Sequence, residues 1–146
     1  MSHTPDRIAK LSRQQSFGAC SRQLEMAGTV VRDTRLAPSV ELTRHLHLEP
    51  YLCIVLDGNY SERARHEIEC KPGSVIAHPG GHVHANRTGR AGARCVNVEF
   101  SPSLLAEETL KLLAVYERQM QLPSSHPALA RLRNALALMD STAAMS

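Results

Sequence analysis

The first candidate for chemistry in this sequence is a pair of histidines two residues apart. His45 and His47 lie in a segment, residues 40–47, whose apolar and β-branched residues favour a β-strand. On a strand such side chains point to the same face, with Cα atoms roughly 6.5 Å apart. Two imidazoles at this spacing can bind one metal ion. The pair is a weak signal by itself, because paired surface histidines are common.

A second group of residues that could bind a metal ion or a ligand follows further along the chain. Gly73 precedes a short apolar run, residues 79–81 (Pro-Gly-Gly) form a turn, and His84 enters the next predicted strand. Six of the eight histidines lie between His45 and His84. A folded sheet could bring the two blocks together.

The elements that must position these residues are mostly strands. Residues 28–101 consist of short segments rich in Val, Ile, Leu and Thr, separated by turn signals such as Asp57-Gly58-Asn59. This pattern predicts an all-β sandwich or barrel. Residues 1–27 have few large apolar groups and predict a weakly structured arm.

Residues 102–146 switch to helical periodicity and predict a helical extension that covers the barrel or pairs with a second subunit. Two helices are expected, the first ending before Pro123 and the second spanning about Pro127 to Met139. The apolar stripe of the first is Leu105, Leu112, Tyr116 and Met120, and that of the second is Leu129, Leu132, Leu136 and Met139.

Alternation along two strands predicts a polar interior. Residues 51–57 are apolar on both faces and should lie centrally in the sheet. In residues 95–100, Cys95, Asn97 and Glu99 share one face, while Val96 and Val98 lie on the other. Since His45 and His47 also share a face, we expect these polar faces to line a pocket.

The spacing of the two blocks resembles the two sequence motifs of the cupin superfamily, small jelly-roll barrels whose motifs face the interior. The residues that match are His45-x-His47, Gly58 and Gly73-x5-Pro79-x-Gly81-x2-His84. The resemblance implies a cupin-like jelly-roll barrel in which His45, His47 and His84 bind zinc, iron, manganese or nickel. The sequence departs from the motifs at the glutamate position, which holds Tyr51, and at the asparagine position, which holds Thr88. A metal-free barrel, in which the histidines bind an organic ligand, is the alternative.

A narrower resemblance concerns residues 50–62, the Pro-Gly turns and residues 94–100. They are similar to the N-terminal sensor and dimerisation half of AraC-type transcription regulators. This resemblance implies a small-molecule effector and a homodimer. The 146 residues contain no helix-turn-helix pair, so we expect no direct DNA binding by this chain.

The leading hypothesis is therefore a non-catalytic, effector-binding cupin domain, and the alternative is a stand-alone metal-dependent enzyme of dioxygenase or isomerase type. The residues predicted to contact the ligand are His45, His47, Tyr51, His78, His84, Asn97 and Glu99. By contrast, the charged face of residues 60–69 predicts a solvated edge, with His66 outside the site.

Composition limits the other function classes. A net charge of +3, from 17 Lys and Arg against 14 Asp and Glu without a basic run, does not favour nucleic-acid binding. No secretory signal or membrane segment is visible, which predicts a cytoplasmic protein with reduced cysteines. Cys53 and Cys95 lie in apolar segments and are expected to be buried.

Overall fold

The chain folds mainly as β-structure, as the sequence predicts. In the described part of the chain one of the two expected C-terminal helices is present, that of residues 127–143. The computed structural model describes residues 8–11, 18–104, 106, 107 and 119–143. No helix in these ranges is long and apolar enough to cross a bilayer. The elements are β1 (Ala9–Leu11), β2 (Ala19–Met26), β3 (Thr29–Leu36), β4 (Glu41–His47), β5 (Tyr51–Arg63), β6 (Glu67–Cys70), β7 (Ser74–His78), β8 (Val83–Phe100), the 3₁₀ turn η1 (Pro102–Leu104), β9 (Gln119–Gln121) and α2 (Pro127–Ala143).

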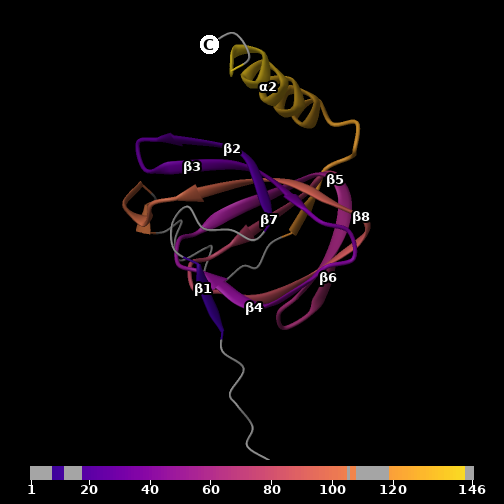
Figure 1. Cartoon of the computed structure of the whole chain (residues 1–146). Coiled ribbons are helices and arrows are strands. Elements are labelled where there is room, and N and C mark those ends of the chain that lie inside the picture. The colour runs from indigo at the N-terminus through magenta and orange to yellow at the C-terminus, as the bar shows by residue number, and fades with distance from the viewer. Residues whose placement is uncertain (1–7, 12–17, 105, 108–118, 144–146) are drawn as a thin grey trace, which may run out of the picture.

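Strand β8 organises the sheet. It pairs antiparallel with β3 and β4 along one edge and with β5 along the other. The main strand order is β1-β4-β8-β5-β7-β9, with β2 beside β3 and β6 beside β5. The strands curl around a common interior, although the described strands do not close into a complete barrel (Figure 1). The long segment Tyr51–Arg63 is central, as its apolar run predicts.

Helix α2 lies outside the curled sheet, above β2 and β3 in Figure 1. Its predicted apolar stripe is confirmed, because Leu129 and Leu136 are buried. They pack with Leu56 of β5 and Val96 of β8. The helix therefore covers the outer face of the sheet and leaves the interior to the residues of the opposite face.

The first predicted helix does not extend to Met120 as expected. Met120 lies in β9, where it pairs with Val75 of β7 and supplies hydrogen bonds to the edge of that strand. Residues 102–104 form only the short turn η1. The expected stripe residues Leu105, Leu112 and Tyr116 lie outside the described residues.

Part of the predicted N-terminal arm belongs to the sheet. Residues 19–26 form β2, which pairs along its length with β3. Residues 9–11 form β1, which runs parallel to β4. Backbone hydrogen bonds to a neighbouring strand hold these segments, so few large apolar side chains are needed there.

The turn expected at Asp57-Gly58-Asn59 is instead an irregular point within β5. Register shifts flank Gly58, which has a left-handed backbone (φ 71°). A Cβ at this position would lie 2.0 Å from the carbonyl oxygen of Gly92 in β8. Glycine therefore lets the two central strands approach each other while β5 bends.

We expect Gly58→Ala to destabilise the fold more than Gly81→Ala. Both glycines have positive φ (71° and 81°), but no atom lies within 4 Å of a Cβ at Gly81. Gly81→Ala should lose about 1 kcal/mol from backbone strain, and Gly58→Ala a further 1–3 kcal/mol, roughly, from the clash. Urea unfolding of both variants measures the difference. Equal losses would contradict the close approach of β5 and β8.

Candidate metal and ligand site

Three histidines converge in the interior through the pairing of β4 with β8. His45 lies directly opposite His84 in this ladder. His47 is two residues further along β4 and faces the same side. All three side chains are buried, and one ring nitrogen of each lies within 4.8 Å of the others. We refer to His45, His47 and His84 as the three-histidine set.

Backbone carbonyls fix the protonation of two of these rings. The Nδ1–H of His45 donates to the carbonyl oxygen of Thr43 (2.8 Å), and that of His84 donates to the carbonyl oxygen of His82 (3.1 Å). Because a carbonyl only accepts, Nδ1 carries the proton and the Nε2 atom of each ring keeps its lone pair. A backbone carbonyl that accepts from the other ring nitrogen is typical of metal-binding histidines.

Burial keeps the three-histidine set uncharged at neutral pH. Burial, with a smaller contribution from nearby imidazoles, lowers the pKa of His47 and of His84 to about 3. Burial also lowers the pKa of His45. Neutral imidazole is the form that binds metal ions.

The residues present fit a divalent transition metal. Three neutral nitrogen donors suit zinc, nickel or iron and leave coordination positions for water or a ligand. The Nδ1 atom of His47 is buried and has no hydrogen-bond partner among the described residues. A buried polar atom without a partner is costly, and a bound ligand would relieve that cost.

Tyr51, at the motif position that holds glutamate in cupins, contacts the three-histidine set directly. Its hydroxyl lies 3.2 Å from Nε2 of His84, and its ring centroid is 4.4 Å from that of His47. Burial raises the pKa of Tyr51 well above 10, so the side chain is a neutral phenol. The three-histidine set therefore has no negative charge from this position.

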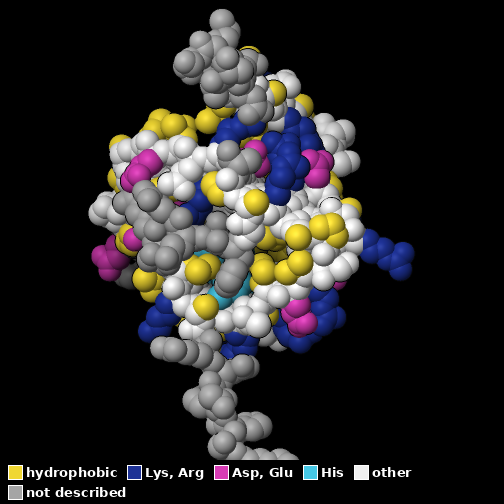
Figure 2. Space-filling model, in the orientation of Figure 1, with side chains coloured by type: hydrophobic (Ala, Val, Ile, Leu, Met, Phe, Trp, Pro, Cys, Tyr) yellow, Lys and Arg dark blue, Asp and Glu magenta, His cyan; other side chains and the backbone are white. Residues whose placement is uncertain are grey.

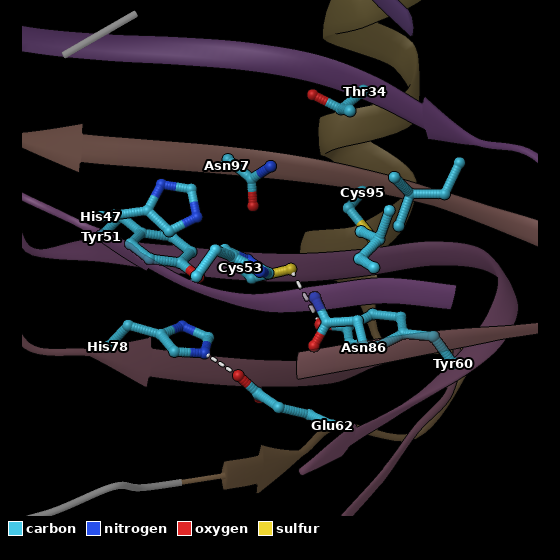
Figure 3. A pocket seen from close by; sticks show the side chains of 13 residues that line it. Thr34, His47, Tyr51, Cys53, Tyr60, Glu62, His78, Asn86, Cys95 and Asn97 are labelled. Carbon is cyan, nitrogen blue, oxygen red and sulfur yellow. Dashed lines mark hydrogen bonds and ion pairs between the residues drawn. The ribbon is translucent and has the colours of Figure 1, made fainter. Parts of the chain in front are cut away.

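Glu62 is a site residue that the sequence interpretation missed. It is buried, and its Oε1 accepts a hydrogen bond from Nε2 of His78 at 2.5 Å (Figure 3). Burial alone would raise the pKa of Glu62, but the neighbouring imidazoles, His78 first, lower it below its usual value. Strand alternation could have identified Glu62 as an interior residue, because Glu62 shares a face with buried Tyr60.

The charged face of residues 60–69 is exposed as predicted. Arg63 and Glu67 on this face are exposed, and so is His66.

A small cavity of about 50 Å³ adjoins these residues. The predicted residues His45, His47, Tyr51, His78 and Asn97 line it, together with Cys53, Cys95 and Tyr60 (Figure 3). In Figure 2 a small area of histidine is visible among hydrophobic side chains.

The lining differs from simple alternation at Leu42 and from the predicted ligand contacts at His84 and Glu99, which are not part of it. Leu42 lines the cavity together with His45, because a register shift between them turns Leu42 inward. Glu99 is buried but is not part of the cavity lining. Its carboxylate pairs with the buried guanidinium of Arg32 and lies 3.9 Å from Nδ1 of His47.

Comparisons with known proteins agree with this architecture. Neither a scan against protein-family models nor a search of curated proteins finds a match. Among solved structures, the cupin domain of Schizosaccharomyces pombe Cnp3 is similar with a TM-score of 0.51 and 12% identity, over 57% of this chain and 61% of that one. This chain has the cupin fold.

Two further structures share the fold. AerE from Microcystis aeruginosa has a TM-score of 0.50 and 14% identity, covering 53% of this chain and 39% of AerE. KdgF from Halomonas sp. has a TM-score of 0.50 and 11% identity, covering 57% of this chain and 81% of KdgF. The match thus spans less than two thirds of AerE and of the Cnp3 domain. At these identities the likeness concerns the cupin fold alone.

The lowered pKa values predict that the metal-free protein loses stability in mild acid. The ordinary pKa of 6.5 applies to His47 and His84 in the unfolded chain, and about 3 applies in the folded one. Below pH 6.5 the unfolded state therefore binds more protons, and the free energy of unfolding falls by up to about 1.4 kcal/mol per pH unit for each histidine. Above pH 6.5 these groups add no pH dependence.

Urea unfolding of chelator-treated protein between pH 7.5 and 5 measures this slope. His84→Gln should reduce it, whereas His66→Gln, at an exposed position, should leave it unchanged. An unchanged slope in His84→Gln would show that the ring of His84 is not buried in its neutral form.

Proposed function

We propose that this cupin domain binds one divalent metal ion at His45, His47 and His84 and a small polar molecule beside it, and that it acts as a small-molecule-binding module. The observation that carries the proposal is the convergence of three buried imidazoles, two of them with Nε2 lone pairs fixed by backbone carbonyls. A bound ion would supply Lewis acidity at this point. The protein's own contribution is to hold neutral donors beside a small, polar-lined cavity.

The size and lining of the cavity limit the ligand. A volume of about 50 Å³ has room for about three to five water molecules, at roughly 10–15 Å³ each. Thr34, Asn86 and Asn97 provide neutral hydrogen-bonding groups on its wall. A molecule of a few heavy atoms with hydroxyl, carbonyl or carboxylate groups therefore fits better than one the size of a sugar.

The narrower role, as the sensor half of an AraC-type regulator, rests on the sequence resemblance of residues 50–62 and 94–100. A sensor of that type binds its effector and pairs subunits without catalysis. The three-histidine set and the adjoining cavity are compatible with effector binding in such a module, and helix α2 is compatible with its helical extension.

A metal-dependent enzyme is the second candidate. The observation that favours it is the cavity next to the three-histidine set, because three protein donors leave coordination positions that a substrate could occupy there. The two candidates differ in what the metal-loaded protein does with a small polar molecule. Thermal stabilisation without chemical change supports the binding module, whereas turnover supports the enzyme.

We expect the chain, prepared without a histidine tag, to bind one Ni²⁺ ion. His47→Gln removes one of three nitrogen donors and should weaken the affinity for Ni²⁺ at least tenfold in isothermal titration calorimetry. His66→Gln removes an exposed histidine and is the matched control, with unchanged affinity. Equal affinities of the two variants would refute the three-histidine set as a metal site.

We further propose that the chain forms a homodimer through the edge of β2. Among the described strands β2 pairs only with β3, so its other edge has no strand partner in the described part of the chain. Leu24 and Met26 lie on one face of β2 and are 41% and 59% exposed. An open strand edge with adjacent apolar side chains favours pairing with a second copy.

Analytical ultracentrifugation tests the homodimer. Met26→Lys should shift the protein from dimer to monomer, because it places a charge at the open edge. Leu138→Lys changes an equally apolar side chain on α2, which is 68% exposed, and should leave the dimer intact. Dissociation by Leu138→Lys alone would move the interface to α2, and a monomeric unmodified chain would exclude the dimer.

A further inference from the structure

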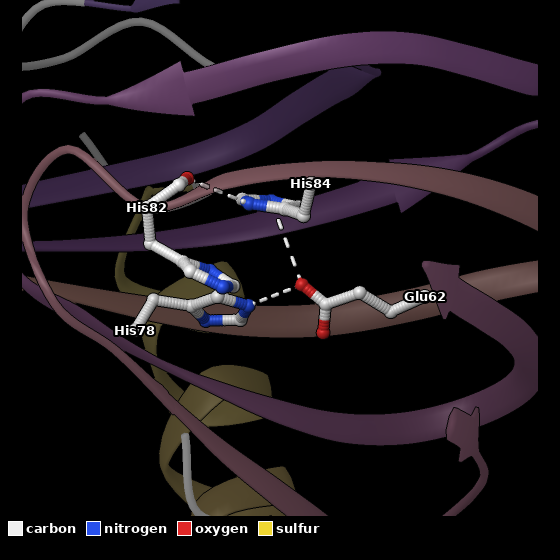
Figure 4. Close-up of side chains that lie close together, drawn as sticks. All are labelled: Glu62, His78, His82 and His84. Carbon is white, nitrogen blue, oxygen red and sulfur yellow. Dashed lines mark hydrogen bonds and ion pairs between the residues drawn. The ribbon is translucent and has the colours of Figure 1, made fainter. Parts of the chain in front are cut away.

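A second group of possible metal ligands also includes His84 (Figure 4). Glu62 near the end of β5, His78 at the end of β7 and His82 in the turn before β8 meet His84 there. One ligand atom from each of the four residues lies within 4.8 Å of the others. We refer to Glu62, His78, His82 and His84 as the Glu62 cluster. Only His84 belongs also to the three-histidine set.

The contacts of Glu62 place one carboxylate oxygen between two imidazoles. Its Oε1 lies 2.5 Å from Nε2 of His78 and 3.6 Å from Nε2 of His84. Glu62, His78 and His84 are 3%, 3% and 2% exposed, so these side chains are largely shielded from bulk solvent. Oxygen and nitrogen donors from three strands are thus assembled around one point of the interior.

An unsatisfied atom of His78 is an independent indication of a ligand. Its Nδ1 is buried and has no hydrogen-bond partner among the described residues. The fold therefore buries a polar ring atom at this point without compensating it. Because Nε2–H donates to Glu62, this Nδ1 keeps its lone pair, and binding of an ion through Nδ1 would offset that cost.

Charge also favours this position for a cation. The three-histidine set provides only neutral donors, because Tyr51 stands at the motif position of the glutamate. Glu62 provides a carboxylate, which offsets part of the charge of a buried divalent ion. Carboxylate oxygen suits Mn²⁺ and also occurs with imidazole at Fe²⁺ sites, whereas an all-imidazole set suits Ni²⁺.

The Glu62 cluster has its own access. A separate cavity of about 110 Å³ is lined by Glu62, His78 and His82, and it extends to exposed His66 and Gln119. An ion could enter from this side without passing the three-histidine set.

We propose that the Glu62 cluster is a second metal position, suited to Mn²⁺ or Fe²⁺, and that it competes with the three-histidine set for Nε2 of His84. The competition follows from the protonation of His84. Its Nδ1–H donates to the carbonyl oxygen of His82, so only Nε2 has a lone pair, and it can bind one ion at a time. The competition, but not the second position itself, rests on the function proposed above.

Metal titrations of the tag-free full chain test the proposal, with Mn²⁺ followed by the electron paramagnetic resonance signal of the free ion and Ni²⁺ by calorimetry. Glu62→Gln should weaken Mn²⁺ binding at least tenfold and change the Ni²⁺ affinity less than threefold. His47→Gln should show the reverse. Glu69→Gln, at an exposed carboxylate on β6, is the matched control and should change neither. In the unmodified chain, one equivalent of Ni²⁺ should release bound Mn²⁺.

The outcomes separate this inference from the proposed function. Unchanged Mn²⁺ affinity in Glu62→Gln, with circular dichroism showing a folded variant, overturns the second position and leaves the three-histidine set untouched. Unchanged Ni²⁺ affinity in His47→Gln overturns the three-histidine set and leaves the second position standing. Simultaneous binding of Mn²⁺ and Ni²⁺ at undiminished affinity overturns the competition for His84. If Glu62→Gln does not fold, His82→Gln takes its place, with the same expected result.

Discussion

The antiparallel register of β8 with β4 and β5 is the constraint on which the site depends. It sets His45 opposite His84 on one side and Tyr51 opposite Glu99 on the other. Because successive side chains of a strand alternate between faces, a shift of one residue would turn these polar groups out of the interior. Gly58 helps to hold the register, since it lets β5 approach β8 at its bend.

This register also makes an interior of polar groups tolerable. Buried imidazoles are acceptable when they are neutral and hydrogen-bonded, and the carbonyl oxygens of Thr43 and His82 meet that condition for two of them. The buried charges of Arg32 and Glu99 are paired with each other. In the described part of the chain, the buried side-chain atoms without a hydrogen-bond partner include Nδ1 of His47 and of His78, which belong to the two proposed metal positions. Others, such as Nε of Arg32 and Oε2 of Glu49, belong to neither position.

Most of the strand architecture could be predicted from the sequence, because alternation and turn residues are local signals. The faces of residues 95–100 and the stripe of α2 are confirmed for this reason. The expected turn at Gly58 and the helix through Met120 failed because a long-range partner decides each of them. Gly58 bends against β8, and Met120 pairs with the edge of β7.

The sequence by itself determined that His45, His47 and His84 belong to two blocks at cupin-like spacing, and that polar faces of strands would line an interior. Only the tertiary structure decided which side chains join them. Glu62 and His78 are sixteen residues apart and meet because β7 folds back beside β5. Strand pairing sets such distances, and no spacing rule within a single segment contains them.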